Sequence, residues 1–280
     1  MTTPCVLLMA HGTPEAVDQM EEYLRNVMTH RPPTPEFVGE MKRRYQAFGG
    51  RSPLTDICRR QAAALEKMLG WPVRVGMRTW RPFIRDEAPM LQGEPLIGLP
   101  LAPHFSKVSV GAYLAALRAA APGRAVTEVE SWHLEPALIE IWARRIRDKL
   151  HPGATLLFTA HSVPVADADP YPRQVREMAE AVAARLPGVK WDLAWQSRSP
   201  APGRWLEPDV DSKLSSMGAR EVLVAPIGFV CDHAEILYDL DVLHRGTARR
   251  LGIAFDRCEM PNDDPLLIDA LAAVARRAVR

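Results

Sequence analysis

Cysteine is scarce in this sequence, and its spacing excludes several kinds of metal centre. The 280 residues contain four cysteines, none of them in a CxxC pair. Structural zinc sites and iron–sulfur clusters require clustered thiolate ligands, so the sequence predicts neither. We expect buried small apolar side chains or free thiols instead. The four positions are Cys5, Cys58, Cys231 and Cys258.

An excess of charge of one sign is also missing. The 35 lysines and arginines and the 34 aspartates and glutamates leave a formal net charge of +1, which indicates no nucleic-acid partner. No apolar run approaches the roughly 18 residues of a membrane-spanning helix, so no integral membrane segment is expected. The opening residues MTTPCVLLMA have no basic region and no cleavage site of a signal peptide, which favours a cytoplasmic protein. Since no GxGxxG or phosphate-loop motif is present, we expect no nucleotide cofactor.

What the sequence does contain is an alternation of short apolar runs with helical patterns. Hydrophobic residues make up 47 % of the chain, enough for a core of ordinary size. Apolar runs bounded by turn residues predict strands at 5–10, 72–78, 95–102, 155–160, 190–196 and 221–229, with weaker candidates at 125–131 and 253–260. Periodicity predicts helices at 16–29, 35–48, 54–69, 110–121, 136–151, 173–186, 233–251 and 265–279, the last capped by Asp264. This alternation favours an α/β fold with parallel sheets covered on both faces.

Two short sequence motifs each occur twice in similar form. LLMAHGTP at 7–14 and LLFTAHSVP at 156–164 both end an apolar run in Ala-His. LAPHFSKVSV at 101–110 and VAPIGFVCDH at 224–233 both carry an Ala-Pro step between a strand and a helix. Ligands of open α/β sheets bind at the carboxyl ends of the strands, so two similar halves facing each other would place His11 and His161 at one cleft.

His161 and Glu235 are the strongest candidates for chemistry, although each has a simpler interpretation. A histidine after a strand can pack there with its ring nitrogens bound to the backbone, or it can serve in a cleft as a base or metal ligand. Glu235 stands three residues after Asp232, which is capping-box spacing, or alternatively it points from the helix start into the cleft. In the second case Asp239 shares its face of the helix, and His233 is a further candidate.

The segment GGRSPL at 49–54 indicates a glycine turn followed by a helix start. Free N–H groups at such a start can hold an anion, together with Arg44 and Tyr45 just upstream. The same letters also describe an ordinary turn with Ser52 as N-cap. The residues alone leave both interpretations open.

Taken in order along nearly the whole chain, these segments resemble ferrochelatase. The closest resemblance is to the monoderm-type coproporphyrin III ferrochelatases. The segments that carry it are HGTP (11–14), RYQAFGGRSPL (44–54), LAPHFSKVSV (101–110), ESWHLEP (130–136), TAHSVP (159–164), DPYPRQ (169–174), WQSRSPAPGRWLEPDV (195–210) and VAPIGFVCDHAEILYDLD (224–241).

The resemblance implies two Rossmann-like halves, each a doubly wound parallel sheet, with a porphyrin cleft between them. The N-terminal half would span 1–132, with the C-terminal helix at 261–280 packing back on it, and the C-terminal half would span 133–260. The implied activity is insertion of Fe²⁺, as substrate, into a porphyrin during haem biosynthesis. We expect a monomer, with a downstream haem-pathway enzyme as a candidate partner.

The resemblance also implies the site residues. His161 is similar to the metal-site histidine of the family and Glu235 to its partner, so both would be catalytic and metal-binding. An imidazole beside a carboxylate suits this role, because the pair can accept pyrrole protons and can hold Fe²⁺ without trapping it. Residues that would bind the porphyrin and its propionates are His11, Thr13, Arg44, Tyr45, Ser52 and Tyr113.

His11 departs from the family pattern, since the matched branch commonly has tyrosine there. We hypothesise that His11 is an axial ligand of product iron on the macrocycle face opposite His161. A second departure from the family pattern is at 28–29, where this sequence has Met-Thr and the family often has basic residues. His30 and Arg31 are the candidates to replace those basic residues in binding a propionate.

The predicted helix that contains Glu235 also departs from the family pattern. One turn beyond Asp239 the chain offers Leu243 rather than an acidic residue, which argues against a second metal site. The sequence also ends at Arg280 without the cysteine-bearing extension of some relatives, so no [2Fe–2S] cluster is expected.

Three other functions stay open. Protoporphyrin IX carries two propionates where coproporphyrin III carries four, and the absence of membrane-binding segments favours the latter. A cobalt or nickel tetrapyrrole chelatase would share the Ala-His strand ends but not the GGxSPL and WQS segments. A non-catalytic haem-binding carrier is favoured by His11 alone, whereas the presence of both His161 and Glu235 argues against it.

Overall fold

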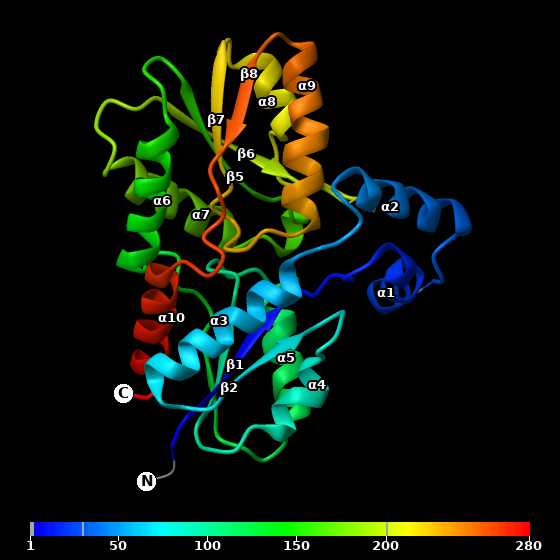
Figure 1. Ribbon diagram of the computed structural model, residues 1–280, viewed down its shortest axis with the longest axis vertical. Helices are drawn as coiled ribbons and strands as arrows, with labels where there is room; N and C mark the ends of the chain where they lie inside the picture. The colour runs from blue at the N-terminus through cyan, green and yellow to red at the C-terminus, as the bar shows by residue number, and fades with distance from the viewer. Residues whose placement is uncertain (1–2, 30, 200) are drawn as a thin grey trace.

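Two parallel four-stranded sheets, each flanked by helices, make up the protein (Figure 1). The computed structural model describes residues 3–29, 31–199 and 201–280. The first sheet has the order β2-β1-β3-β4 and contains β1 (Cys5–Ala10), β2 (Val73–Met77), β3 (Leu96–Pro100) and β4 (Val126–Glu128). The second has the order β6-β5-β7-β8 and contains β5 (Thr155–His161), β6 (Trp191–Gln196), β7 (Glu221–Ala225) and β8 (Ala254–Arg257). Because both sheets share one order, the two halves repeat one topology, and the predicted α/β fold is confirmed.

The helices fall close to their predicted positions, with a few differences. In the first half they are η1 (Val17–Gln19), α1 (Met20–Val27), α2 (Pro35–Ala47), α3 (Leu54–Leu69), α4 (Ile84–Glu87), η2 (Ala88–Met90) and α5 (Val110–Ala120). After it come α6 (Pro136–Lys149), η3 (Val165–Asp167), α7 (Tyr171–Ala183), α8 (Val210–Ser216), η4 (Glu235–His244), α9 (Arg245–Arg250) and α10 (Pro265–Arg277). The short α4 and α8 were not predicted, because so few residues carry no clear periodicity. The helix predicted at 233–251 divides into the π-helix η4 and the α-helix α9.

β1 explains why the strands are almost continuously apolar. All six of its residues are buried. Val6 and Leu8 pack on one face of the sheet in the main apolar cluster, whereas Leu7 and Met9 pack on the other face in a second cluster. Alternate side chains of a strand point to opposite faces, so a sheet covered on both faces needs apolar residues at every position.

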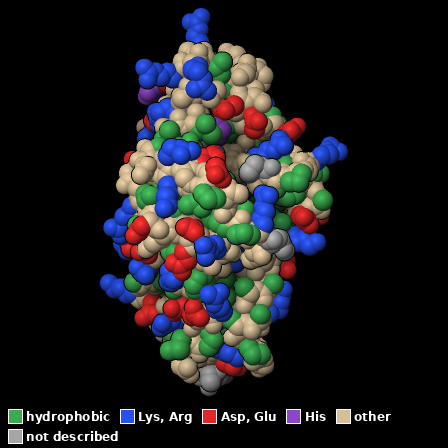
Figure 2. All heavy atoms as spheres, turned by 90° about the vertical axis from the view of Figure 1, so that its right-hand side faces the viewer, with side chains coloured by type: hydrophobic (Ala, Val, Ile, Leu, Met, Phe, Trp, Pro, Cys, Tyr) green, Lys and Arg blue, Asp and Glu red, His purple; other side chains and the backbone are tan. Residues whose placement is uncertain are grey.

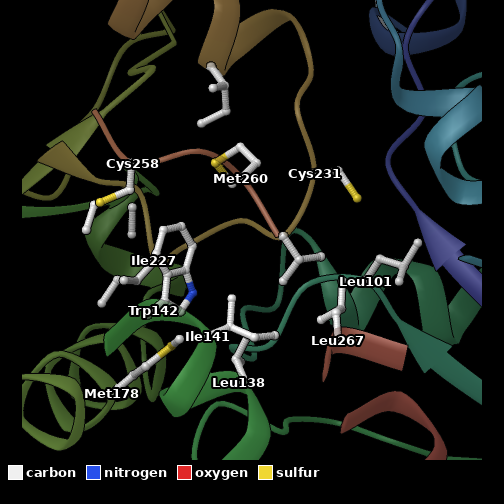
Figure 3. Packing of buried hydrophobic residues seen from close by; sticks show 14 of the residues in the cluster. Leu101, Leu138, Ile141, Trp142, Met178, Ile227, Cys231, Cys258, Met260 and Leu267 are labelled. Atoms are coloured by element: carbon white, nitrogen blue, oxygen red, sulfur yellow. The ribbon is translucent and has the colours of Figure 1, made fainter. Parts of the chain in front are cut away.

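One apolar cluster joins the two halves (Figure 3). It includes Leu99 of the first sheet, Phe158 of the second sheet and Trp142 of α6. Helix α10 packs against both α3 and α6, and the Asp264 side chain caps it as predicted by accepting from the Leu266 N–H. The cluster contains residues from both sides of position 133, so the two halves do not have separate cores. We therefore propose 1–132 and 133–260 as two halves that are defined by their repeated topology. The segment 261–280 packs against both of them.

The surface carries charge of both signs. Figure 2 shows lysine and arginine side chains interspersed with acidic ones over the face that it displays, in keeping with the net charge of +1. In the part of the chain that the structure describes, no helix combines the length and apolar character needed to cross a membrane.

The backbone at Gly228 lies close to Ala160 of β5, so a substitution at Gly228 tests the packing there. A Cβ at this position would lie 2.6 Å from the Cβ and 2.7 Å from the Cα of Ala160. We expect Gly228→Ala to lower the free energy of unfolding by about 1–3 kcal/mol in urea denaturation, because the backbone must shift. Gly246→Ala in α9 is the control, since its Cβ would meet nothing closer than an Arg250 nitrogen at 3.7 Å. The free energy of unfolding of this control should rise by about 0.5–1 kcal/mol. Equal stability of the two variants would contradict the close approach of Gly228 to Ala160.

Candidate active site

A cavity of about 440 Å³ opens where the carboxyl ends of the two sheets face each other. His11 follows β1, and His161 ends β5, so the two Ala-His phrases of the sequence meet in one cavity. The segments after β3 and β7 complete its wall, with Leu101 from the first and Gly228 from the second. The wall is largely apolar, so few polar groups face the interior.

Glu235 lies between two histidines in this wall. Its Oε1 is 3.5 Å from His161 Nε2, and its Oε2 is 3.5 Å from His233 Nε2. The other ring nitrogen of each histidine is fixed by the backbone: His161 Nδ1 lies 2.5 Å from the Ser162 carbonyl and His233 Nδ1 2.9 Å from the Cys231 carbonyl. With Nδ1 donating to a carbonyl, the Nε2 atoms of both rings are directed at the carboxylate.

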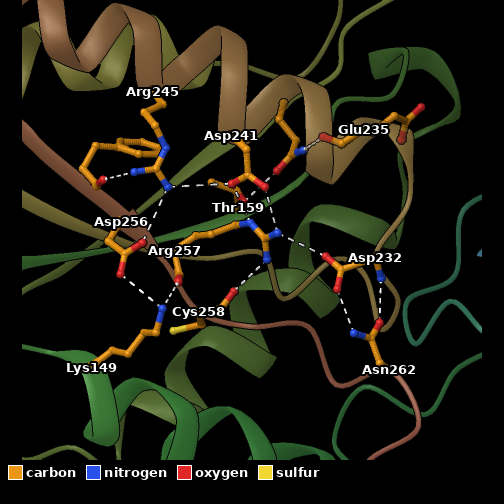
Figure 4. Close-up of polar contacts among 12 residues, drawn as sticks. Lys149, Thr159, Asp232, Glu235, Asp241, Arg245, Asp256, Arg257, Cys258 and Asn262 are labelled. Carbon is orange, nitrogen blue, oxygen red and sulfur yellow. Dashed lines mark hydrogen bonds and ion pairs between the residues drawn. The ribbon is translucent and has the colours of Figure 1, made fainter. Parts of the chain in front are cut away.

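The structure also decides between the two interpretations of Glu235. Ala234, not Asp232, precedes the helix, and no side chain caps it, so the capping-box interpretation is wrong. The Asp232 carboxylate instead accepts from Arg257 at 3.2 Å and from Asn262 at 2.7 Å (Figure 4). Arg257 also donates to Asp241 of η4, so it connects the segment before the helix to the helix itself.

The start of η4 is held from the second sheet as well. Gln196 at the end of β6 donates from its Nε2 to the Glu235 carbonyl at 3.1 Å, and accepts from the Thr159 hydroxyl at 2.8 Å. In Figure 4 the Glu235 side chain points away from the Arg257 contacts. The helix start is therefore anchored behind Glu235, which leaves the carboxylate directed into the cavity.

The charges of the pair stabilise each other. Burial lowers the pKa of His161, but the Glu235 carboxylate, with smaller contributions from the Ser162 carbonyl and the Asp239 carboxylate, brings the net shift upward. Burial raises the pKa of Glu235, yet His161 and then His233 bring it well below its usual range. Without a metal, the low-pH form of the site is therefore an imidazolium beside a carboxylate.

His11 behaves differently from His161. Burial is the main cause that lowers its pKa to about 4, and the Glu235 carboxylate only partly opposes this effect. At neutral pH the ring is uncharged, which is the form that binds a metal. Gly12 follows with φ of +92°, and a Cβ there would lie 2.9 Å from Trp80, so only glycine fits the turn that follows His11.

The remaining porphyrin-binding candidates divide into two groups. Thr13, Tyr45 and Tyr113 line the cavity. Ser52 is buried behind this wall, where its hydroxyl lies 2.8 Å from that of Thr13. Pro53 holds the N-cap position of α3, and the Ser52 hydroxyl accepts a long hydrogen bond from the Leu54 N–H at 3.5 Å, at the start of that helix.

Arg44 does not line the cavity. Its guanidinium pairs with Glu40, one turn earlier on α2, and lies 5.5 Å from the centre of the Tyr238 ring of η4. It therefore stands between α2 and the π-helix. Of the two predicted basic substitutes, Arg31 is exposed and His30 lies outside the described residues.

Several lining residues were not among the predicted site residues. Sequence reasoning mentioned His233 only as a nearby candidate, although it contacts Glu235. His104 belongs to the LAPHFS segment and was not considered for a role. Arg78 does not line the cavity itself, but its guanidinium approaches the carbonyl of the lining residue Val108 at 3.5 Å, and no local pattern marked it. Other unpredicted members of the wall are Tyr23, Tyr171, Trp205 and Phe229.

Across the described residues, no group of three or more histidine, cysteine, aspartate or glutamate side chains is placed to hold a metal ion. Asp239 accepts a hydrogen bond from Ser197, and burial followed by the charge of Glu235 raises its pKa. A metal at this site would thus have His161 and Glu235 as protein ligands and would need its other ligands from a bound molecule.

Comparison with known proteins identifies the relatives of this chain. The sequence model of the family described as Ferrochelatase matches residues 3–279. A protein of Acidobacterium capsulatum named ferrochelatase is 36 % identical over 97 % of this chain and 93 % of its own. A protein of Geobacillus kaustophilus named coproporphyrin III ferrochelatase is 33 % identical over 97 % of this chain and 95 % of its own.

The solved structures show a similar fold at much lower identity. SirB from Bacillus subtilis with Fe³⁺ has a TM-score of 0.60 and 11 % identity, over 99 % of this chain and 95 % of that one. CbiX, described as the terminal enzyme of sirohaem biosynthesis in denitrifying bacteria, has a TM-score of 0.57 and 14 % identity, over 98 % and 99 %. At such identities the likeness concerns the fold alone.

The Glu235 carboxylate should control the titration of His161. In Glu235→Gln the favourable charge is lost while burial persists, so the pKa of His161 should fall below its ordinary value. NMR titration of labelled imidazoles measures this shift. Glu221→Gln is the matched control, because Glu221 binds the exposed His151 at 2.7 Å and neither residue lines the cavity. An unchanged or raised pKa of His161 in Glu235→Gln would refute the electrostatic assignment.

Proposed function

The chain belongs to the ferrochelatase family and is an enzyme that inserts iron into a porphyrin; we propose that ferrous iron and coproporphyrin III are its substrates. The observation that carries the proposed mechanism is the contact of His161 and Glu235, 3.5 Å apart in the wall of a largely apolar cavity. An imidazole nitrogen and a carboxylate oxygen can hold Fe²⁺ without the tight binding of a thiolate cage, so the ion can still be released to the macrocycle.

The same pair can remove protons. A free porphyrin carries two pyrrole N–H protons, and both must leave as the metal enters. His161 Nε2 faces the carboxylate, so a proton accepted there is stabilised at once by the adjacent negative charge. His233 on the other side of Glu235 keeps that carboxylate ionised and oriented. His161 and Glu235 are therefore the residues we propose as catalytic and metal-binding.

The apolar wall is suited to an aromatic macrocycle. Tyr45 and Tyr113 offer hydroxyl groups beside apolar surface, and Thr13 offers a hydroxyl supported by Ser52. Burial raises the pKa of both tyrosines, so these hydroxyls are neutral donors for propionates. Arg44 stands between α2 and η4 and would have to exchange its Glu40 contact for a propionate.

Two observations favour coproporphyrin III over protoporphyrin IX. The relatives from Geobacillus carry the name coproporphyrin III ferrochelatase, over nearly the full length of both chains. Four propionates also need more donors than two, and the exposed Arg78, which contacts the cavity residue Val108, adds one donor to the predicted set. The proposal includes a cytoplasmic monomer that needs neither a nucleotide nor an iron–sulfur cluster and that passes its product to a downstream haem-pathway enzyme.

We propose that His11 approaches the macrocycle from the face opposite His161. Both rings belong to the same cavity and follow equivalent strands of the two halves. His11 is uncharged at neutral pH, and it is therefore ready to act as an axial ligand of product iron.

The decisive activity test compares coproporphyrin III and protoporphyrin IX with anaerobic Fe²⁺. We expect faster insertion into coproporphyrin III, and a loss of about 100-fold or more in His161→Ala, because a general base and metal ligand is removed. The control is His151→Ala, a surface histidine that should leave the rate unchanged.

Each alternative predicts a different result of this test. Faster turnover of protoporphyrin IX would keep the enzyme and reject the coproporphyrin branch. Faster insertion of cobalt or nickel than of iron would favour a different tetrapyrrole chelatase. Tight haem binding without turnover of either porphyrin would leave a carrier and reject the proposal.

The role of His11 can be tested on the product complex. In His11→Ala the absorption spectrum of bound ferric product should change, since one axial nitrogen ligand is lost. Fluorescence quenching should show nearly the same affinity for the metal-free porphyrin. A product spectrum identical to that of the wild-type protein would exclude His11 as the ligand.

A further inference from the structure

His104 is a buried cavity residue whose polar atoms have no partner. It follows β3, lines the cavity and is only 1 % exposed. Neither Nδ1 nor Nε2 of its ring has a hydrogen-bond partner. A neutral imidazole always carries one N–H and one lone pair, and burying such groups unpaired costs about 1–3 kcal/mol. Since buried polar groups are nearly always paired, an exception of this kind calls for a functional reason.

His133 continues from His104 toward the surface. The two ring centroids are 5.6 Å apart, and the planes differ by 32°. His133 Nδ1 is also buried without a partner, whereas its Nε2 lies 2.9 Å from Glu177 Oε2. Glu177 is on α7 with a third of its side chain exposed (34 %). The three side chains come from three separate segments and form a row from the cavity wall to solvent.

We propose that His104 and His133 relay protons from the cavity to Glu177 and on to solvent. The proposal rests on the proposed function, since metal insertion is the reaction that releases two protons into this cavity. It gives the unpaired ring nitrogens a role, because a relay residue needs a free acceptor on the side from which the proton arrives.

The hydrogen bond to Glu177 sets the direction of transfer. The Nε2–H of His133 donates to the carboxylate, so its Nδ1 carries the lone pair. A proton that reaches one nitrogen of His104 displaces the proton on the other, which passes to His133 Nδ1 through one water, because the two rings share no direct hydrogen bond. His133 then gives its Nε2 proton to Glu177, and the carboxyl group releases it to bulk water. Each ring returns to its starting tautomer by rotation of the imidazole, and no electrons are transferred.

The pKa shifts of His104 and Glu177 favour groups that pass a proton on over groups that keep it. Burial and then the neighbouring His133 lower the pKa of His104 well below its usual range, so a proton does not stay there. The His133 hydrogen bond lowers the pKa of Glu177, and the Arg173 guanidinium at 2.8 Å adds to this. Tyr171 packs edge-on against His104 at 5.9 Å and also lines the cavity, which keeps the path beside the macrocycle.

The test removes the relay at its surface end, where folding is least at risk. His133→Phe keeps a ring but no nitrogen, and Glu177→Gln keeps the shape but cannot accept a proton. The control is His151→Phe, because His151 forms a similar pair with Glu221 away from the cavity wall. Single-turnover insertion of Fe²⁺ into coproporphyrin III is followed in H₂O and in D₂O, with porphyrin affinity measured by fluorescence quenching and Tm by calorimetry.

We expect both relay variants to insert iron about tenfold more slowly, a smaller loss than that of a direct acid or base because water offers a slower route. Porphyrin affinity should stay unchanged, and the solvent isotope effect should increase as proton release becomes limiting. The control should match the wild-type protein in all three measurements.

Other outcomes overturn the relay. Normal rates in both variants, or slow rates with weakened porphyrin binding and an unchanged isotope effect, would mean that the histidines only pack. If His133→Phe fails to fold, the exposed Glu177→Gln decides the question alone. Wild-type protein that inserts no iron would reject the proposed function and the relay together, whereas active wild-type protein with normal variants rejects the relay only.

Discussion

The site depends on one carboxylate held between two imidazoles. Among the residues that the structure describes, Glu235 forms ion pairs with His161 and His233 and with no lysine or arginine, so its ionisation relies on the two histidines. Both rings are oriented by backbone carbonyls through Nδ1, so neither can turn away without losing that bond. An isolated carboxylate in an apolar wall would be protonated, and it would neither bind a cation nor accept a proton.

The same charge affects the surrounding phenols. Burial is the main cause of the raised pKa values of Tyr23, Tyr45, Tyr113 and Tyr171, and Glu235 adds to the shift in each case. These four side chains therefore remain neutral and present hydroxyl groups and ring faces to the cavity. The cavity combines a single charged centre with an otherwise neutral wall, which suits a flat aromatic ligand that gains a cation and loses protons.

Local patterns were enough for much of the fold. The strand predicted at 5–10 and the helix predicted at 54–69 have the observed bounds, because apolar period and helix breakers are local features. The repeated Ala-His phrases also correctly indicated that His11 and His161 share a cleft.

Contacts between distant segments account for what sequence reasoning missed. Asp232 has the spacing of a helix cap, but Arg257 and Asn262 bind its carboxylate instead. Arg44 lies 5.5 Å from the centre of the Tyr238 ring of η4, a contact that its own segment does not indicate, and its role at a propionate stays a prediction. The unpaired nitrogens of His104 result from packing among three separate segments, so no motif could reveal them. Likewise, the π-helical geometry of η4 is a tertiary feature that the apolar period of the segment does not indicate.

The shared apolar cluster couples the unfolding of the two halves. Two repeated halves suggest two units that could melt one after the other, but the same side chains complete both cores through α6 and α10. Loss of order in one half exposes the apolar surface of the other, so unfolding should be a single cooperative event. The cleft thus retains its two facing histidines, His11 and His161, only while the whole chain is folded, and partial melting leaves no half-active enzyme.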